Sequence, residues 1–268
     1  MTWEKKTVLI TAKAAPETSK KYGESVCTAG ITDTGEFIRL FPITLDCWKK
    51  GLGFKKFDWI EVECEKYQDY LSRKESYHIK PGSAIRVIDG SLNEKKKGRV
   101  DWESRNKALF PMRSNSLEDL QVSFERDRTS LGLIRVNKLI DFYKTKELNE
   151  EEKETRNSYQ AYFDVENPTR PLKKAWILHQ IPHIFKYRFK CEGDSCCEHD
   201  MTCEDWELFE AYRKWPDTYV TEDKTWEMIR DRFFVRMVKN DLHFFVGTHS
   251  QFPSWMIIGL YYPPKGID

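Results

Sequence analysis

Short segments that alternate apolar and polar residues dominate the first half of the chain. The run 59–65 alternates apolar and charged side chains, which is typical of a strand buried on one face only. Five further segments place β-branched and aromatic residues between turn signals: 7–11, 25–31, 36–41, 84–88 and 133–136. These patterns predict an N-terminal part built mainly from β-strands.

Helical spacing appears beside strands further along the chain. Ser116 or Asn115 is expected to cap a short helix over 117–121, and Thr202 with Asp205 gives the pattern of a second capped start. A third helix is expected from Thr221, with four apolar residues on one face: Trp226, Ile229, Phe233 and Met237. Segment 184–190 alternates as a strand, and 242–246 and 255–262 predict a C-terminal hairpin with a long loop.

The character of the sequence changes around residues 144–174. The run 146–156 is rich in charge and lacks helical apolar spacing, and Pro168 and Pro171 follow it. We therefore expect an exposed loop or linker here. This gives two regions: 1–145, which is β-rich, and 172–268, which is α+β.

One short run concentrates metal-binding side chains. Residues 191–203 hold four of the seven cysteines and one of the six histidines. Thiolates and imidazoles packed this closely favour a tetrahedral zinc ion. We predict that Cys191, Cys196, His199 and Cys203 bind it, with Cys203 in the first turn of the helix that Thr202 is expected to cap.

The ligand set leaves alternatives open. Cys197 could replace Cys196 or Cys203, and free cysteines on a loop would also fit the sequence. Four protein ligands make a closed, structural site, whereas binding by Cys191, Cys196 and His199 alone would leave an open, catalytic position. In the same region, Asp200 and Asp205 are tentative acid/base residues, although carboxylates at a helix start commonly answer the helix dipole alone.

Charge and composition narrow the class of partner. The net charge of +1 hides an asymmetry, because residues 1–140 hold 26 Lys and Arg against 20 Asp and Glu, and the remainder holds 18 against 23. The first half is thus the better candidate for a polyanionic partner. No apolar run is long enough for a membrane span, and the N-terminus lacks a signal-peptide core, so a cytoplasmic protein with reduced thiols is expected.

The basic and aromatic stretch 48–57 matches the chemistry of single-strand recognition. Lysines between aromatic rings would meet phosphates while the rings stack on bases, and aromatic residues make up 14% of the chain. The alternative is a solvated loop with rings that face the core. The expected contact residues are Arg39, Trp48, Lys49, Lys50, Lys55 and Lys56.

Two stretches resemble known groups of proteins. The run 19–30 with 35–39 resembles the opening of the dual OB-containing domain family, and 130–135 resembles a later strand of the same module. That resemblance implies small β-barrels and binding of nucleic acid or nucleotides. The cysteine-rich second half resembles an uncharacterised group of prokaryotic and phage-linked proteins. This second resemblance does not suggest a particular activity.

Together these observations predict an α+β, β-rich fold. One or two OB-like β-barrels precede a smaller α+β part with a zinc-stapled loop. The expected function is nucleic-acid binding, DNA more than RNA, in prokaryotic defence or genome maintenance. Two alternatives stay open: a DNA glycosylase or nuclease directed at modified phage DNA, and a protein-interaction module whose C-terminal hairpin pairs with a partner through its edge.

Overall fold

The computed structural model describes most of the chain except the long segment between the two halves. The described residues are 2–15, 17–19, 23–44, 53–68, 73–96, 98–145, 181, 183–193, 196–215, 221–249 and 254–267. The predicted loop or linker around 144–174, apart from its first two residues, and the predicted contacts Trp48, Lys49 and Lys50 lie outside them. No helix of the described part is long and apolar enough to cross a membrane.

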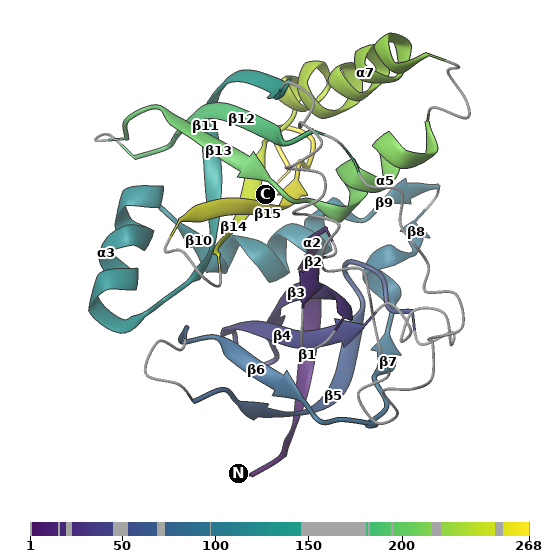
Figure 1. The fold of residues 1–268 in the computed structure, drawn as a ribbon, viewed down its shortest axis with the longest axis vertical. Helices are drawn as coiled ribbons and strands as arrows, with labels where there is room; N and C mark the ends of the chain where they lie inside the picture. Colours follow the sequence, from purple (N-terminus) through teal and green to yellow (C-terminus); the bar gives the residue numbers. More distant parts are fainter. Residues whose placement is uncertain are drawn as a thin grey trace.

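Five strands of the first half close into a barrel, barrel 1, in the lower part of Figure 1. They are β1 (Glu4–Lys13), β3 (Gly23–Thr32), β4 (Phe37–Thr44), β5 (Trp59–Lys66) and β6 (Ser76–Ile79). The strand order is β1-β3-β4-β6-β5, and pairing of β5 with β1 closes the ring. In β5, buried apolar residues alternate with half-buried charged residues, as the sequence pattern predicted.

Five strands of the second half close in the same order into barrel 2. They are β11 (Leu131–Lys144), β12 (Phe185–Cys191), β13 (His199–Cys203), β14 (His243–Thr248) and β15 (Trp255–Tyr261). The order is β11-β12-β13-β15-β14, and β14 pairs back onto β11. Aromatic rings of β12 and β14 fill the interior, because alternate residues of a strand point to the same side.

Strand pairing identifies both barrels as OB folds. In each, the third strand pairs in parallel with the fifth, β4 with β6 and β13 with β15, while the other pairings that close the ring are antiparallel. This five-stranded Greek-key ring is the architecture of the OB fold. The predicted α+β, β-rich class with OB-like barrels is therefore confirmed.

In the described part of the chain four α-helices surround the barrels, and a side chain caps the start of each. They are α2 (Trp102–Leu109), α3 (Leu117–Asp127), α5 (Trp206–Lys214) and α7 (Glu222–Arg230), capped by Asp101, Ser116, Asp205 and Thr221 in turn. The helix expected to start near Thr202 begins later, because the Asp205 side chain accepts the Leu208 N–H and Thr202 still belongs to β13. Cys203 is accordingly the last residue of a strand.

Short elements complete the described fold. They are β2 (Glu17–Ser19), β7 (Arg86–Asp89), the hairpin β8 (Lys95–Lys96) and β9 (Arg99–Val100), β10 (Arg113–Ser114), the 3-10 turns η1 (Ser91–Asn93), η2 (Phe110–Met112) and η4 (Met237–Lys239), and the π turn η3 (Asp231–Val235). The turns η3 and η4 continue α7 and deliver the chain to β14.

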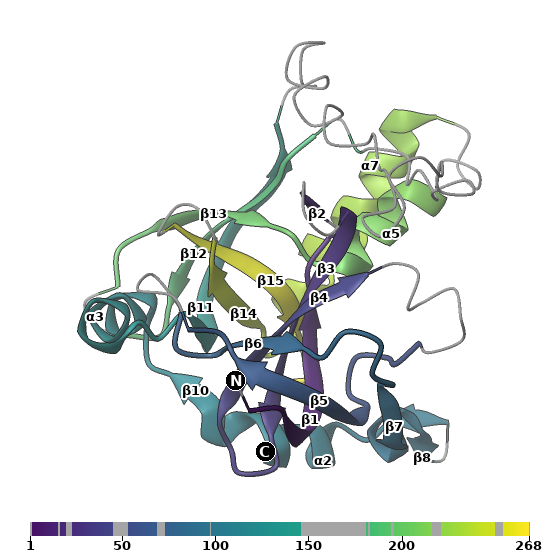
Figure 2. The same cartoon turned by 60° about the horizontal axis from the view of Figure 1, so that its bottom comes forward.

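The two barrels share a buried core. Outward residues of β1 and β3, such as Leu9 and Ile31, pack in one cluster with Leu133, Phe245 and Tyr261 of barrel 2. In Figure 2, β1 and β3 lie against β15. A side chain at Gly259 would place its Cβ 2.8 Å from the Cβ of Ala12, so the strands of the two barrels approach closely there. The outer face of barrel 1 is therefore covered by barrel 2.

The division between the halves differs from the one expected from the sequence. The first barrel ends before α2, and β11 pairs with β12 and β14 of the second barrel. The predicted region 1–145 thus includes a strand of barrel 2. The reason is that β11 is followed by the charged run 146–156, and that composition break falls inside barrel 2, between its first two strands.

Candidate functional site

Four potential metal ligands converge beside barrel 2. Glu118 lies in the first turn of α3, Cys191 ends β12, and Cys196 and His199 lie in the turn and first residue that lead into β13. One ligand atom from each lies within 4.8 Å of all the others. The group combines two thiols, an imidazole and a carboxylate, and it could hold a metal ion.

Local hydrogen bonds fold the turn around this point. Cys196 N–H donates to the Gly193 carbonyl at 3.0 Å, and Cys191 N–H points at Cys196 Sγ at 2.9 Å. The N-terminus of α3 reaches the same turn, because the Leu117 N–H donates to the Cys191 sulfur. A Cβ at Gly193 would lie 3.0 Å from Ser116 Cβ, so a larger residue would push the turn away from α3.

Burial and hydrogen bonds set the protonation states of the side chains in this group. Burial raises the pKa of the Cys191 thiol to about 12, and burial lowers the pKa of His199. Burial alone would raise the pKa of Glu118, but hydrogen bonds from its own N–H and from Cys197 lower it overall. The carboxylate is therefore ionised and the imidazole neutral, and a divalent cation would favour loss of the thiol protons.

The structure brings together three of the four predicted ligands. Cys203 is fully buried in the interior of barrel 2, outside the group, and burial raises its pKa well above the usual value. Glu118 takes the fourth place, 3.4 Å from His199 Nε2. Cys197 is exposed, and its N–H donates to the Glu118 carboxylate at 3.2 Å.

Most of the described residues that were expected to contact nucleic acid serve the joint between the barrels. Arg39 is only 1% exposed, and its Nη2 donates to the Ser130 carbonyl at 3.1 Å. Lys56 Nζ donates to the Leu260 carbonyl at 2.6 Å. Lys55 is exposed. Arg39 and Lys56 are therefore not available to a strand on the surface, since neighbouring carbonyls of barrel 2 already hold them.

A basic surface lies instead on the outside of barrel 2. In β12 the aromatic residues point inward, and Lys186, Arg188 and Lys190 point outward. Lys138 of β11 lies directly opposite Lys190, and both are exposed. We call the outward side chains of β11, β12 and β13 the β12 face; its charged and aromatic members include Lys138, Asp141, Tyr143, Lys186, Arg188, Lys190 and Asp200.

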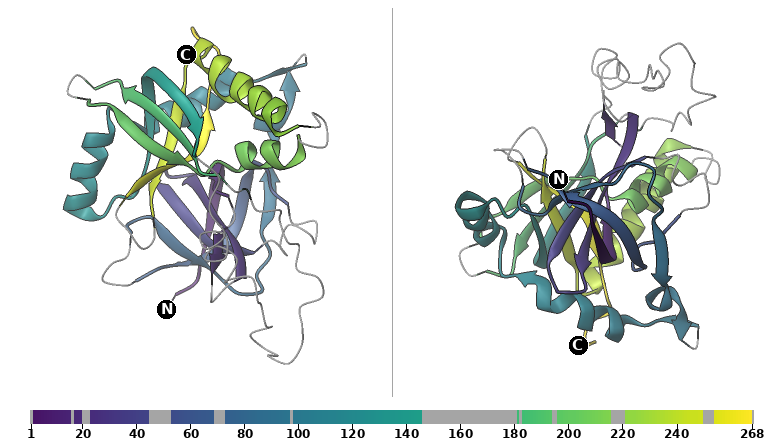
Figure 3. Two further views of the ribbon diagram at one scale, coloured as in Figure 1. Left: turned by 45° about the horizontal axis from the view of Figure 1, so that its top comes forward. Right: turned by 90° about the horizontal axis from the view of Figure 1, so that it is seen from below.

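Ion pairs divide the cations of the β12 face into two kinds. Lys186 pairs with Asp200 at 3.1 Å, and Arg188 pairs with Glu198. Within the described residues, Lys138 and Lys190 have no acidic partner. The face lies on the side of barrel 2 away from barrel 1 (Figures 1 and 3). Among the described residues Lys138, Arg188 and Lys190 are exposed, and the two lysines without an acidic partner lie near the Cys191 end of the β11–β12 ladder.

The two carboxylates proposed for acid/base chemistry have structural partners. Asp205 is 2% exposed, and its two oxygens accept the N–H groups of Leu208 at 3.0 Å and Leu260 at 3.1 Å. Burial raises its pKa to about 6. Desolvation alone would raise the pKa of Asp200, but hydrogen bonds from Tyr143 and Lys186 lower it overall. Asp205 therefore fixes the start of α5, and Asp200 belongs to the β12 face.

Strand pairing limits how a partner could add to the C-terminal hairpin. Within the described residues β14 pairs with β11 on one side and β15 on the other, so neither of its edges is open, whereas β15 shares only the pair Cys203–Ile257 with β13. The alternative of a protein-interaction module stays a prediction.

His243 is a buried titratable group outside any candidate site. It is fully buried against Phe110, with ring centroids 5.2 Å apart. Burial lowers its pKa to about 4, although Asp241 acts in the opposite direction. The folded protein therefore holds this imidazole neutral at pH 7.

This burial predicts a pH-dependent difference in stability between the wild type and His243→Phe. An unfolded histidine titrates near pH 6.5, so the stability contributed by the neutral ring is complete above that pH and lost as pH falls toward 4. Relative to the variant, the wild type should lose up to about 3 kcal/mol over this range. Urea unfolding of both proteins at several pH values measures it. A difference that does not change with pH would contradict a neutral His243.

Comparison with known proteins identifies the family. The model of the family described as "Domain of unknown function (DUF8757)" matches residues 113–268, and "Domain of unknown function (DUF8758)" matches residues 4–111. The chain belongs to the first of these families, and the two matches meet between α2 and β10. The two barrels confirm the OB fold that the resemblance to the dual OB-containing domain family implied. The two families whose models match are described differently, as DUF8757 and DUF8758.

Known structures and curated proteins add little to this identification. No match was found among curated proteins. A chain in the structure of a replication protein A heterotrimer bound to single-stranded DNA is similar over 99% of this chain and 50% of its own length, with 9% identity and a TM-score of 0.36. The present chain thus spans about half of that neighbour. The assignment of OB folds here rests on strand pairing alone.

Proposed function

We propose that this protein binds single-stranded nucleic acid on the β12 face of barrel 2. In an OB fold, the outer face of the second and third strands is the surface that takes oligonucleotides. The observation that carries the proposal is that barrel 2 leaves this face open, whereas the corresponding face of barrel 1 is buried in the shared core.

The chemistry of the β12 face suits a single strand better than a duplex reader. Lys138 and Lys190 offer uncompensated charge to phosphates, and Tyr143 lies on the same face as a ring for stacking. No helix of the described chain projects from this face in the way that a major-groove reader requires. DNA is the first partner to test. The defence or genome-maintenance setting and the cytoplasmic location stay predictions.

We also propose that the metal in the Glu118 group is zinc. Two thiolates and an imidazole are ligands that zinc prefers, and a carboxylate oxygen completes a tetrahedral set. Four protein ligands leave no open position, so the ion would be structural. It would tie α3 to the turn between β12 and β13, at one end of the β12 face.

Reversing the two unpaired lysines should weaken binding strongly. Each lost phosphate contact makes the negative slope of log K against log salt shallower by about 0.7 for single strands. The double variant Lys138→Glu with Lys190→Glu should therefore bind about 25-fold more weakly at about 0.1 M salt. Fluorescence anisotropy with a labelled DNA strand of about 20 nucleotides, repeated at several salt concentrations, measures both quantities.

A matched charge reversal serves as the control. Lys95→Glu with Arg99→Glu changes net charge equally on the β8–β9 hairpin, which belongs to neither barrel. This pair should alter affinity by less than about threefold through long-range charge alone. Equal losses from both pairs would show that the β12 face is not the binding surface. Absence of binding to single-stranded DNA and RNA at low salt would overturn the proposal.

A further inference from the structure

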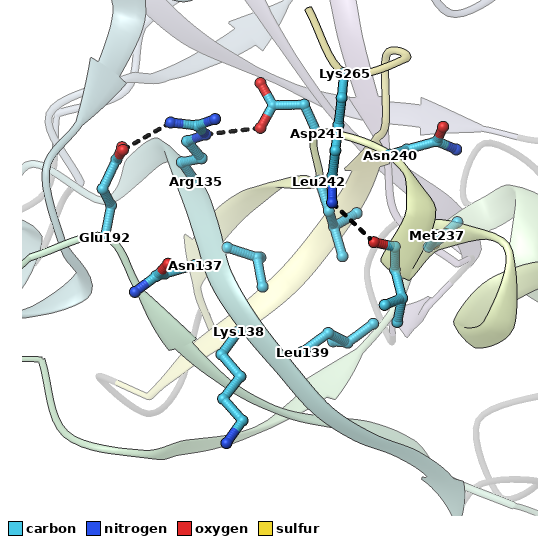
Figure 4. A pocket seen from close by; sticks show the side chains of 12 residues that line it. Arg135, Asn137, Lys138, Leu139, Glu192, Met237, Asn240, Asp241, Leu242 and Lys265 are labelled. Carbon is cyan, nitrogen blue, oxygen red and sulfur yellow. Dashed lines mark hydrogen bonds and ion pairs between the residues drawn. The ribbon is translucent and has the colours of Figure 1, made fainter.

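A cavity opens where β11 leaves its neighbour β14. The first residues of β11 pair with β14 as far as Arg135, and Val136 N–H makes one more bond to the Leu242 carbonyl. Beyond this point, in the described chain, β11 pairs with β12 only. The turn η4 and residues 240–242 bound the space left beside β11, a cavity of about 340 Å³ that we call the β11 cavity (Figure 4).

The lining of the β11 cavity mixes apolar and polar side chains, and more of its exposed surface is polar than apolar. The apolar residues are Val136, Leu139, Met237, Val238 and Leu242. Arg135 forms ion pairs with Glu192 and Asp241, each at 2.7 Å, so two carboxylates share one guanidinium (Figure 4). The volume lies at the lower end of the range of about 300–1,000 Å³ found for small-molecule sites.

Two amide side chains on this rim have unused hydrogen-bonding groups. Asn137 and Asn240 line the cavity from opposite sides, and within the described residues neither side chain has a hydrogen-bond partner. Each amide offers donors and an acceptor. Lys138 also lines the cavity and belongs to the β12 face, so the cavity adjoins the proposed path of the strand.

We infer that the β11 cavity takes one nucleobase of the strand bound on the β12 face. This inference rests on the proposed function and adds to it a site that selects a base. An aromatic heterocycle is apolar on its faces and carries donors and acceptors on its edge, which suits a lining where apolar side chains such as Val136 and Leu139 stand beside polar ones, including the amides of Asn137 and Asn240. Asparagine amides are well suited to read base edges.

Other ligand classes fit the cavity less well. A phosphate would meet the carboxylates of Glu192 and Asp241, and a metal cation would meet Arg135, Lys138 and Lys265. A purely apolar ligand would cover Asn137 and Asn240 and leave their amides without partners, which costs free energy. An uncharged ring with a polar edge avoids all three costs.

The test compares homopolymers on the wild type and on amide variants. Anisotropy with labelled dA, dC and dT strands of equal length should show one base preferred by roughly fivefold or more. Asn137→Ala and Asn240→Ala should each reduce that preference to within about twofold while the salt slope stays unchanged, because the phosphate contacts remain. Asn115→Ala changes an exposed amide outside the cavity and should keep the preference.

The outcomes separate this inference from the proposed function. No binding of any strand overturns both. Binding that is equal for all bases, or a preference that both asparagine variants retain, overturns the base site and leaves strand binding intact. The last experiment is a titration with free mononucleotides. Suppose that they bind saturably, that Asn240→Ala abolishes this binding, and that strands show no base preference. The cavity would then be a site for free nucleotides, and the inference would be overturned. Thermal melts of the variants verify that each is folded.

Discussion

Replacing Cys191 by serine is expected to prevent binding of the proposed zinc ion and to lower the free energy of unfolding by about 3 kcal/mol or more. Cys191 is 1% exposed, and its sulfur lies where the end of β12 meets the N-terminus of α3. A serine oxygen is a much poorer zinc ligand than a thiolate, and the binding energy of a structural zinc ion contributes directly to folding. Metal analysis of reduced, purified protein and urea unfolding measure the two effects.

Two neighbouring cysteines provide the controls for this prediction. Cys197→Ser changes an exposed thiol outside the ligand group and should keep about one zinc ion per chain and nearly full stability. Cys203→Ala should destabilise barrel 2 by opening a small gap in its core, yet keep the zinc. Retention of the metal by Cys191→Ser, or its loss from Cys203→Ala, would show that the ligand set is wrong.

Glu118 separates the geometric ligand set from the one expected from the sequence. Glu118→Ala should weaken zinc binding, since it removes the ligand that α3 contributes. A competition assay with a chromophoric chelator measures this affinity. Unchanged affinity would return the fourth place to a cysteine or to water.

Local patterns in the sequence were sufficient to predict most of the barrel strands, though not β6 or β13, and three members of the group that could hold a metal ion. Alternation in β5 and the density of thiols between Cys191 and His199 are local features, and the structure keeps them. Glu118 could not be found in this way, because 73 positions separate it from Cys191 and its carboxylate also suits the first turn of any helix. Only the packing of α3 against the β12–β13 turn brings it to the group.

Two of the predicted contact residues, Arg39 and Lys56, lie in the joint between the barrels for a related reason. Charge in a sequence does not reveal which face of a barrel another barrel will cover. The shared core buries Arg39 against Ser130, while the alternation in β12 exposes Lys186, Arg188 and Lys190. Each strand pattern was informative, but the choice between the two OB faces depends on tertiary contacts.

The shared core leads to the second large effect, expected from Phe245→Ala. Phe245 is 1% exposed and packs with residues of both barrels. Removal of a buried phenylalanine ring typically costs about 3–5 kcal/mol. Because the core belongs to both barrels, we expect one cooperative unfolding transition at a lower urea concentration, observed equally by circular dichroism and tryptophan fluorescence.

An exposed site of similar chemistry gives the comparison for Phe245→Ala. Ile88→Ala on the edge strand β7, where the side chain is 53% exposed, should change stability by less than about 0.5 kcal/mol. Two separate transitions in Phe245→Ala or in the wild type would mean that the barrels fold independently, and the face of barrel 1 would then be available for part of the time. A single transition would mean that this face of barrel 1 stays buried in the folded protein. The proposed binding of nucleic acid would then use the β12 face of barrel 2.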